Sequence, residues 1–220
     1  GEVFGLATLD LSSGRFELIE NLSDIDLVSE LYRFSPAEIL ISEDAKYPPV
    51  ATDAAGSKMR PPWEFELANA QNALTSHFGL KDLSSFDCDG LVLAIQAAGC
   101  LITYVKQTQR TELPHINGLQ HIRSNEAIHI DGASRRNLEL TQNIQGGDEN
   151  TLFSILNQTA TSMGARLLQR WINRPIRSRA VLNDRLNAVE YILNGQYQSI
   201  LTEHLKKIGD IERILARVAL

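Results

Sequence analysis

The chain has 220 residues, of which 43% are hydrophobic and 22% are charged, and its formal net charge at pH 7 is −6. This length suggests one large domain or two smaller ones, and the ordinary composition excludes a disordered, collagen-like or disulfide-scaffold protein. The two cysteines, Cys88 and Cys100, match no metal-binding or redox spacing, so we expect buried or idle thiols. The most apolar run, residues 91–105, contains Gln96 and is too short to cross a bilayer.

The charge is distributed unevenly along the chain. Residues 1–112 contain 8 Lys/Arg and 17 Asp/Glu, whereas residues 113–220 contain 13 and 10. An acidic first half argues against phosphate binding there. The second half is only mildly basic, which is weak evidence for nucleic-acid binding.

The chain opens with the pattern of a β-hairpin followed by a helix. Residues 3–11 alternate as a half-buried strand requires, and a Ser-Ser-Gly turn signal separates them from a second alternating stretch. Ser23 is expected to begin the helix, because Asp26 occupies the capping-box position. The predicted apolar face of this helix consists of Ile25, Val28, Leu31 and Tyr32.

Further elements indicate a mixed α/β first part. A short buried strand is predicted at residues 38–42, and the proline-containing residues 43–62 are expected to be irregular. A helix over residues 66–78 ends at Gly79, a natural C-cap, and its core face is predicted to be Leu67, Ala70, Leu74 and Phe78. The next helix, residues 91–108, is apolar nearly all round, so we expect it to be the buried spine of this domain.

The second part is predicted to be helical. After a linker-like stretch and a short strand at residues 128–130, we expect residues 131–175 to form a packed hub with helices at 152–156 and 167–172. Ser178 begins a helix that ends at Gly195, with a core face of Leu182, Leu186, Val189 and Leu193; helices over 197–208 and from Asp210 follow as antiparallel neighbours. Since the chain begins with Gly and stops within a helical pattern, we expect a piece of a longer protein.

Asp10 is the strongest candidate for metal chemistry. Ribonuclease-H-like nucleases place a carboxylate on their first strand to hold Mg²⁺, and Glu43 and Asp44 follow the next buried strand. The alternative is that Asp10 is a polar residue at a strand end beside a turn. A metal site needs several converging carboxylates, and the spacing shows no such signature, so an Mg-dependent nuclease is the alternative function.

Other motifs give little evidence of catalysis. The five histidines have no paired-ligand spacing, and Gly146-Gly147 lacks the lysine of a phosphate loop, so we expect no cofactor and no metal. Arg135 and Arg136 could contact phosphate, but we expect them instead to form ion pairs with Glu139 and with neighbouring helices. A basic cluster faces either DNA or an acidic neighbouring domain, two alternatives that stay open: Arg166, Arg170, Arg174 and Arg177, with Arg179 beside them.

Several blocks along the whole chain resemble bacterial MutS, the family of DNA mismatch-recognition proteins. They are GLATLDLSSGRF, PPWEFEL, QRTELPHI, SRRNLELTQN, GGDENTLFSILNQTATSMGARLLQRWINRPI and IGDIERILARVAL, in the family's order. The resemblance implies an α/β plus all-α architecture. Residues 1–113 would be the connector domain with a ribonuclease-H-like fold, 114–126 a linker, and 127–220 the truncated N-terminal part of the helical core, or lever, domain.

The resemblance also implies a function. MutS is a dimeric clamp that recognises mispaired bases and signals through ATP binding to recruit MutL. The mismatch-reading Phe-x-Glu motif and the Walker loop are expected outside this chain. We therefore expect this segment to be a non-catalytic monomer without a cofactor, and the full-length protein to be a cytoplasmic, nucleoid-associated homodimer that binds mismatched duplex DNA, ATP and Mg²⁺.

The family's MutL-docking region matches the outer side of the helix at residues 66–78. Here it reads Gln71, Asn72, Ala73, where relatives carry two glutamines at the last two positions. Gln71 is expected nearer the core face, so Asn72 is the better candidate.

Overall fold

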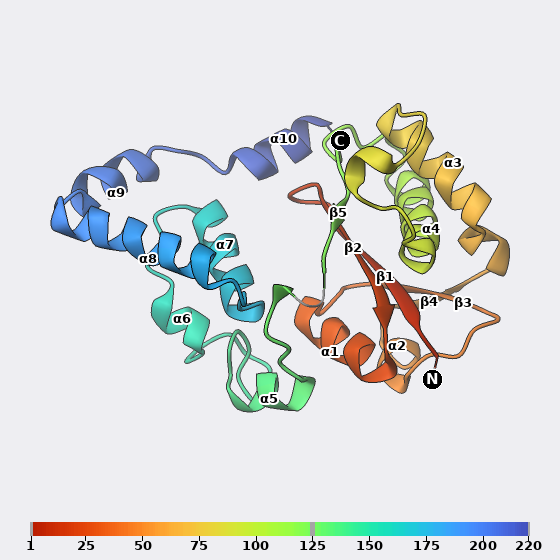
Figure 1. Cartoon of the computed structure of the whole chain (residues 1–220), viewed down its shortest axis with the longest axis horizontal. Helices are drawn as coiled ribbons and strands as arrows, with labels where there is room; N and C mark the ends of the chain where they lie inside the picture. Colours follow the sequence, from red (N-terminus) through yellow and green to blue (C-terminus); the bar gives the residue numbers. More distant parts are fainter. Residues whose placement is uncertain (1, 124–125, 220) are drawn as a thin grey trace. The chain divides into compact units, whose positions relative to one another are not determined.

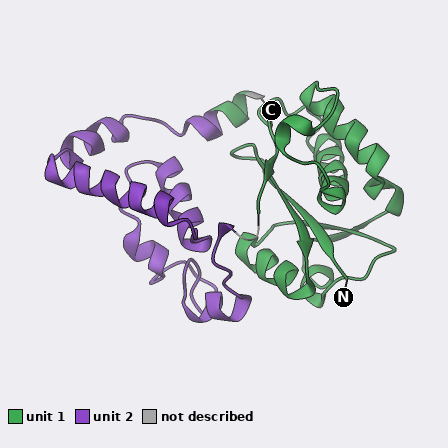
Figure 2. Cartoon of the chain, viewed as in Figure 1, with its two compact units in different colours: residues 1–123, 215–220 green, residues 124–214 purple. Residues whose placement is uncertain are grey.

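The computed structural model describes residues 2–123 and 126–219. The chain divides into two compact units, which Figure 2 distinguishes by colour. Unit 1 contains residues 1–123 and 215–220, and unit 2 contains residues 124–214. No described helix is long and apolar enough to cross a membrane.

The strands of unit 1 form two small sheets (Figure 1). The predicted hairpin is confirmed: β1 (Phe4–Asp10) and β2 (Arg15–Leu22) are antiparallel, and β5 (Gln120–His121) adds to β2 in parallel. The predicted buried strand is β3 (Ile39–Ser42), which pairs in parallel with β4 (Ser57–Arg60) in a second sheet. The described strands do not join into one sheet, so a ribonuclease-H-like topology stays a prediction.

The prediction that residues 43–62 are irregular is wrong in part. They include β4 and a single helical turn, α2 (Pro49–Thr52), and they lead into the 3-10 helix η1 (Pro62–Phe65). The stretch at β4 reads Ser-Lys-Met-Arg, which has no alternating apolar pattern. This strand forms because the backbone of β3 pairs with it, which local sequence cannot indicate.

Helix α1 (Asp24–Phe34) begins as predicted but packs on another face. Ser23 and Asp26 form the capping box, each side chain accepting the other residue's backbone N–H at 3.3 Å. The predicted core face is wrong in part: Leu31 is buried as expected, but Ile25 is 70% exposed and Tyr32 is 56% exposed. Leu27, which was not predicted, is buried beside Leu31 in a cluster that includes residues of the hairpin. The helix carries two apolar stripes, and the sheet covers only one of them.

Helix α4 (Val92–Gln109) is the spine of unit 1, as predicted. It packs on β1, β2 and α3 (Leu67–Phe78), and it buries apolar side chains along its length. Two glycines allow these contacts. A Cβ at Gly5 would lie 2.1 Å from the backbone of Leu93, and a Cβ at Gly99 would lie 2.2 Å from that of Ala70. Figure 1 shows α3 and α4 side by side.

The first turn of α4 is capped from another element. Its N-cap residue Leu91 has no side-chain cap, so the first amides need a partner. The Glu20 carboxylate on β2 accepts hydrogen bonds from the backbone N–H of Ala94 at 2.6 Å and of Leu93 at 3.1 Å. A carboxylate also suits the positive end of the helix dipole.

The predicted core face of α3 is confirmed, as is its end at Gly79. Ala70 and Leu74 are buried, Leu67 and Phe78 pack against the same cluster, and Gly79 has a left-handed backbone. The 3-10 helix η2 (Ser84–Phe86) follows. Beyond α4, the segment predicted as a linker packs into unit 1 through Leu113, Ile116, Leu119 and Ile122.

Unit 2 is helical, as predicted, but sparsely packed. Its helices are α5 (Gly132–Asn137), α6 (Leu152–Leu156), α7 (Ser162–Asn173), α8 (Arg179–Asn194), α9 (Gln198–Lys206) and the start of α10 (Ile211–Ala219). The Ser178 cap is confirmed, since its hydroxyl accepts from the Val181 N–H. The strand predicted at residues 128–130 is wrong: an isolated bridge joins Ala127 to Ile176.

The predicted packed hub and the predicted core face of α8 are also wrong. Among the described residues of 131–175, only Leu140 and Thr151 are buried. On α8 the face is continuous but exposed, with Leu186 at 65%. An apolar stripe specifies a face that can be buried, but its partner must come from elsewhere in the fold.

Candidate functional site

The outer side of α3 is an uncharged surface on a helix that packs closely against α4. Gln71 and Asn72 are exposed, whereas Ala73 is half-buried and packs against the core cluster. Because Gln71 and Asn72 are both exposed, the expectation that Gln71 lies nearer the core face stays a prediction. Apart from His77, no residue of α3 can carry a charge. The amides of Gln71 and Asn72 have no hydrogen-bond partner among the described residues, so they can bond to a partner molecule.

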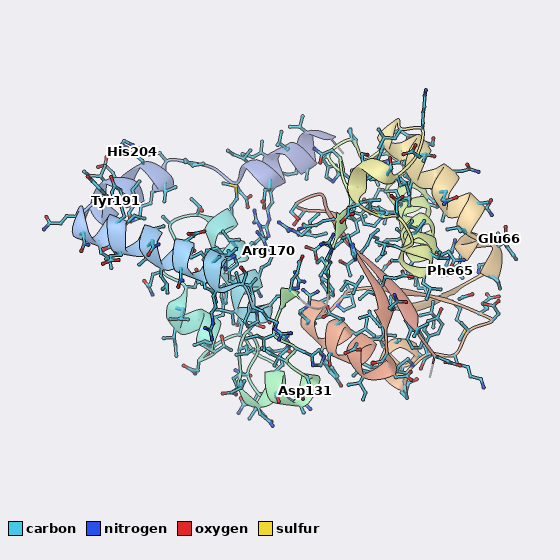
Figure 3. All side chains as sticks on the ribbon, in the orientation of Figure 1. Phe65, Glu66, Asp131, Arg170, Tyr191 and His204 are labelled. Carbon is cyan, nitrogen blue, oxygen red and sulfur yellow. The ribbon has the colours of Figure 1, made fainter. Side chains whose placement is uncertain are left out.

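The N-terminal end of this surface is held by side-chain hydrogen bonds. Asn69 Nδ2 donates to the carbonyl oxygen of Trp63 at 3.0 Å and to the carboxylate of Glu66 at 3.1 Å. Figure 3 marks Glu66 at the start of the helix. Together with the close contact between Ala70 and Gly99, these bonds fix the position of α3 in unit 1.

Asp10 organises the hairpin turn. Its Oδ1 accepts from the backbone N–H of Ser12 at 2.9 Å and from the Ser12 hydroxyl at 2.8 Å, and its Oδ2 accepts from the Ser13 hydroxyl at 2.7 Å. Burial raises the pKa of Asp10, but these bonds from Ser13 and Ser12 outweigh it, so the pKa lies below its ordinary value. Both carboxylate oxygens are thus used within the turn, which supports the structural role.

The other carboxylates proposed for a metal site do not complete one. Asp44 accepts a hydrogen bond from the Ser42 hydroxyl at the end of β3. No group of three or more His, Cys, Asp or Glu in the described part of the chain could hold a metal ion. The geometry therefore gives no support to the nuclease alternative.

Arg166 is neutralised by acidic residues of its own unit. Its guanidinium on α7 donates to both carboxylate oxygens of Asp210, at 2.8 and 2.6 Å, and to Glu212 at 2.7 and 3.0 Å. The hydrogen bonds raise the pKa of Arg166 and lower the pKa of Asp210 to about 2. The basic cluster was expected to face either DNA or acidic groups, and Arg166 faces acidic groups. Glu212 lies in the first turn of α10, and Asp210 directly precedes that helix.

The remaining arginines of the cluster have mixed surroundings. Arg174 lies 3.9 Å from the Glu126 carboxylate, and Arg170, labelled in Figure 3, is half-buried on α7. Arg177 is exposed, and its backbone N–H donates to the carbonyl oxygen of Glu126. A DNA-facing role for these three residues stays a prediction.

Arg135 has a structural role that spacing did not reveal. Its guanidinium donates to the side-chain oxygen of Asn173 at 2.7 Å and to the Asn173 carbonyl at 2.9 Å, which holds α5 against the end of α7. The expected partner, Glu139, accepts the Ile144 N–H at 2.8 Å. Arg135 and Asn173 are 38 positions apart in the chain, which puts this pair beyond any local motif.

The two thiols are buried, as predicted. Burial raises the pKa of Cys88 to about 11 and that of Cys100 to about 12, so neither is a thiolate at neutral pH. Cys88 belongs to the apolar core cluster, and the Cys100 thiol donates to the carboxylate of Glu64 at 3.7 Å.

The chain combines an α/β unit with a helical unit, and the best-organised polar groups of both units hold elements of the fold together. The comparison with protein families identifies the family of the chain. Residues 1–117 match MutS domain II, and residues 133–220 match MutS domain III. The first match alone covers more than half of the chain, so the chain belongs to the MutS family of DNA mismatch repair.

Proposed function

We propose that this chain is the connecting part of a MutS mismatch-repair protein, without an active site of its own. In the whole protein it couples mismatch binding to the ATPase, and its first domain docks MutL. The matches to MutS domains II and III, in that order, support this proposal. ATP, Mg²⁺ and mismatched duplex DNA bind elsewhere in a full-length cytoplasmic homodimer, whereas this chain is a monomer.

The observation that carries the docking proposal is the outer side of α3. A docking surface binds its partner more tightly when its backbone is already ordered, because binding then loses less conformational entropy. Here α3 is fixed by the contact between Gly99 and Ala70, and it exposes the unpaired amides of Gln71 and Asn72. Because α3 carries no Asp, Glu, Lys or Arg, MutL should be held by hydrogen bonds and packing rather than by ion pairs.

The test is a titration of the 220-residue chain with the N-terminal domain of MutL, followed by light scattering or NMR. Asn72→Arg places a bulky charge on the surface and should weaken binding at least about tenfold, the effect of about 1.4 kcal/mol. Gln107→Arg is the matched control, since Gln107 is also an exposed helical amide of unit 1 but lies on α4. It should bind like the wild type.

The salt dependence tests the chemistry of the contact. Ion pairs across an exposed interface weaken as salt rises, whereas neutral hydrogen bonds do so very little. We expect nearly equal affinity at low and at physiological ionic strength. Wild-type binding by Asn72→Arg would place the docking surface elsewhere.

A further inference from the structure

Two imidazoles hold residues 113–122 inside unit 1. Nε2 of His77, near the end of α3, lies 2.9 Å from the carbonyl oxygen of Ile116. Nε2 of His115 lies 3.0 Å from the carbonyl oxygen of Leu11, directly after β1. The His77 bond therefore joins α3 to the segment, and the His115 bond joins the segment to the hairpin.

The protonation state of each ring follows from its partner. A carbonyl oxygen only accepts hydrogen bonds, so each Nε2 carries the hydrogen and donates it. Nδ1 of His77 and Nδ1 of His115 are both buried without a hydrogen-bond partner among the described residues. In the neutral ring of His77 this atom is a bare acceptor. In the His77 imidazolium it would be a buried N–H donor with no acceptor among the described residues, which is costly.

Titratable groups around His77 act on its protonation in opposite directions. Lys106 on α4 opposes protonation, as does His115, whereas Glu112 favours it. Lys106 and Glu112 form an ion pair at 2.7 Å, so neither acts on the ring as an isolated charge. Burial is the largest influence, and it lowers the pKa of His77 below the ordinary 6.5, although the bond to Ile116 opposes this effect.

We propose that His77 is the proton-sensitive element of a latch: residues 113–122 stay docked in unit 1 while its imidazole is neutral, and they loosen when it takes up a proton. The segment includes the end of the match to MutS domain II, and the match to domain III begins at residue 133. The latch thus sets how much chain is free between the two domains. It does not depend on the proposed docking of MutL.

The direction of the pH effect follows from linkage. A histidine whose pKa is lower in the docked state binds fewer protons there than when it is released. Docking is therefore at full strength above about pH 6.5 and weakens as the pH falls below it. The docking constant falls by up to about tenfold per pH unit until the pKa of the docked state is reached.

Amide hydrogen exchange of the whole chain measures the docking directly. The Ile122 N–H donates to the carbonyl oxygen of Leu18 at 2.8 Å, so its protection reports whether the segment is seated on β2. Protection factors, corrected for the intrinsic rate, should fall as the pH is lowered from about 7.5 to about 5.5. His77→Gln should remove this fall, because its amide can donate to Ile116 but does not titrate.

His204→Gln is the matched control, since His204 is exposed on α9 (Figure 3) and should leave the pH dependence unchanged. Constant protection in the wild type would overturn the latch, as would an equal fall in His77→Gln. If His77→Gln is poorly protected even at the higher pH, an NMR titration of the wild-type ring decides. A midpoint below 6.5 that coincides with loss of Ile122 protection supports the latch, and a midpoint at or above 6.5 overturns it.

Discussion

Both units contain helices with continuous apolar faces, but unit 1 buries those of α3 and α4, whereas the face of α8 in unit 2 is exposed. In unit 1, Leu74 on α3 is fully buried, and α4 is enclosed by α3 and the hairpin. In unit 2, Leu186 at the middle of the α8 face is 65% exposed, and among the described residues only Leu140 and Thr151 are buried. The difference shows that an amphipathic pattern and a core are separate properties.

Unit 2 is held mainly by polar contacts. Thr151, Thr161 and Ser178 cap the first turns of α6, α7 and α8. Arg166 binds Asp210 and Glu212, and Arg135 binds Asn173. Such contacts each contribute modestly to stability, whereas core burial in unit 1 contributes cooperatively.

The largest expected effect comes from equal truncations in the two units. Leu74→Ala should lower the free energy of unfolding of unit 1 by about 2–5 kcal/mol, because it opens a cavity in the core. Leu186→Ala should change the stability of unit 2 by no more than about 0.5 kcal/mol, as is usual for surface positions. Unit 1 contains Trp63 and unit 2 contains Trp171. Urea unfolding followed by fluorescence in variants that keep one tryptophan therefore measures the stability of each unit separately. Equal losses would mean that the α8 face is covered in solution.

A smaller effect should follow from filling the contact between α3 and α4. Gly99→Ala places a methyl group 2.2 Å from the Ala70 Cα, so the helices must separate, at a cost of about 1–3 kcal/mol in unit 1. Gly118→Ala is the control, because its methyl would meet nothing nearer than 3.6 Å. The same urea experiment compares them. Equal stability of the two variants would contradict rigid mounting of α3.

The smallest expected effect is local and appears only in acid. The pKa of Asp210 is lowered to about 2 by Arg166, so its contribution is complete above the ordinary value of 3.8 and is lost as the pH falls through about 2. Exchange of the Ile214 N–H, which donates to the Asp210 carbonyl at 2.9 Å, should accelerate over this range. Arg166→Met should exchange faster already at neutral pH, unlike the control Arg179→Met. Wild-type protection in Arg166→Met would show that the ionic cluster does not hold α10.

The features that the sequence predicted correctly are local. The capping box of Ser23, the C-cap at Gly79 and the Ser178 cap each depend on a few neighbouring residues. The buried spine α4 was predictable because apolar residues on all sides of a helix leave few alternatives. The α3 surface came from resemblance alone, and its role in docking stays a prediction.

The features that the sequence did not reveal depend on distant partners. Strand β4 forms against β3, and α1 buries Leu27 rather than Ile25 because of where the hairpin lies. In the candidate site, Arg166 meets Asp210 across 44 residues, and no spacing rule connects them. Periodicity identifies the faces of an element, whereas the fold as a whole decides which face is used.

The carboxylate of Glu20 has a consequence for the order in which unit 1 assembles. The first turn of a helix is its costliest part to form, and α4 lacks a side-chain cap of its own. The acceptor for the Leu93 amide is the carboxylate of Glu20 on β2, which lies 73 positions earlier in the chain. The hairpin thus supplies the acceptor that the first turn of the spine helix lacks, and we expect the two to form together as unit 1 folds.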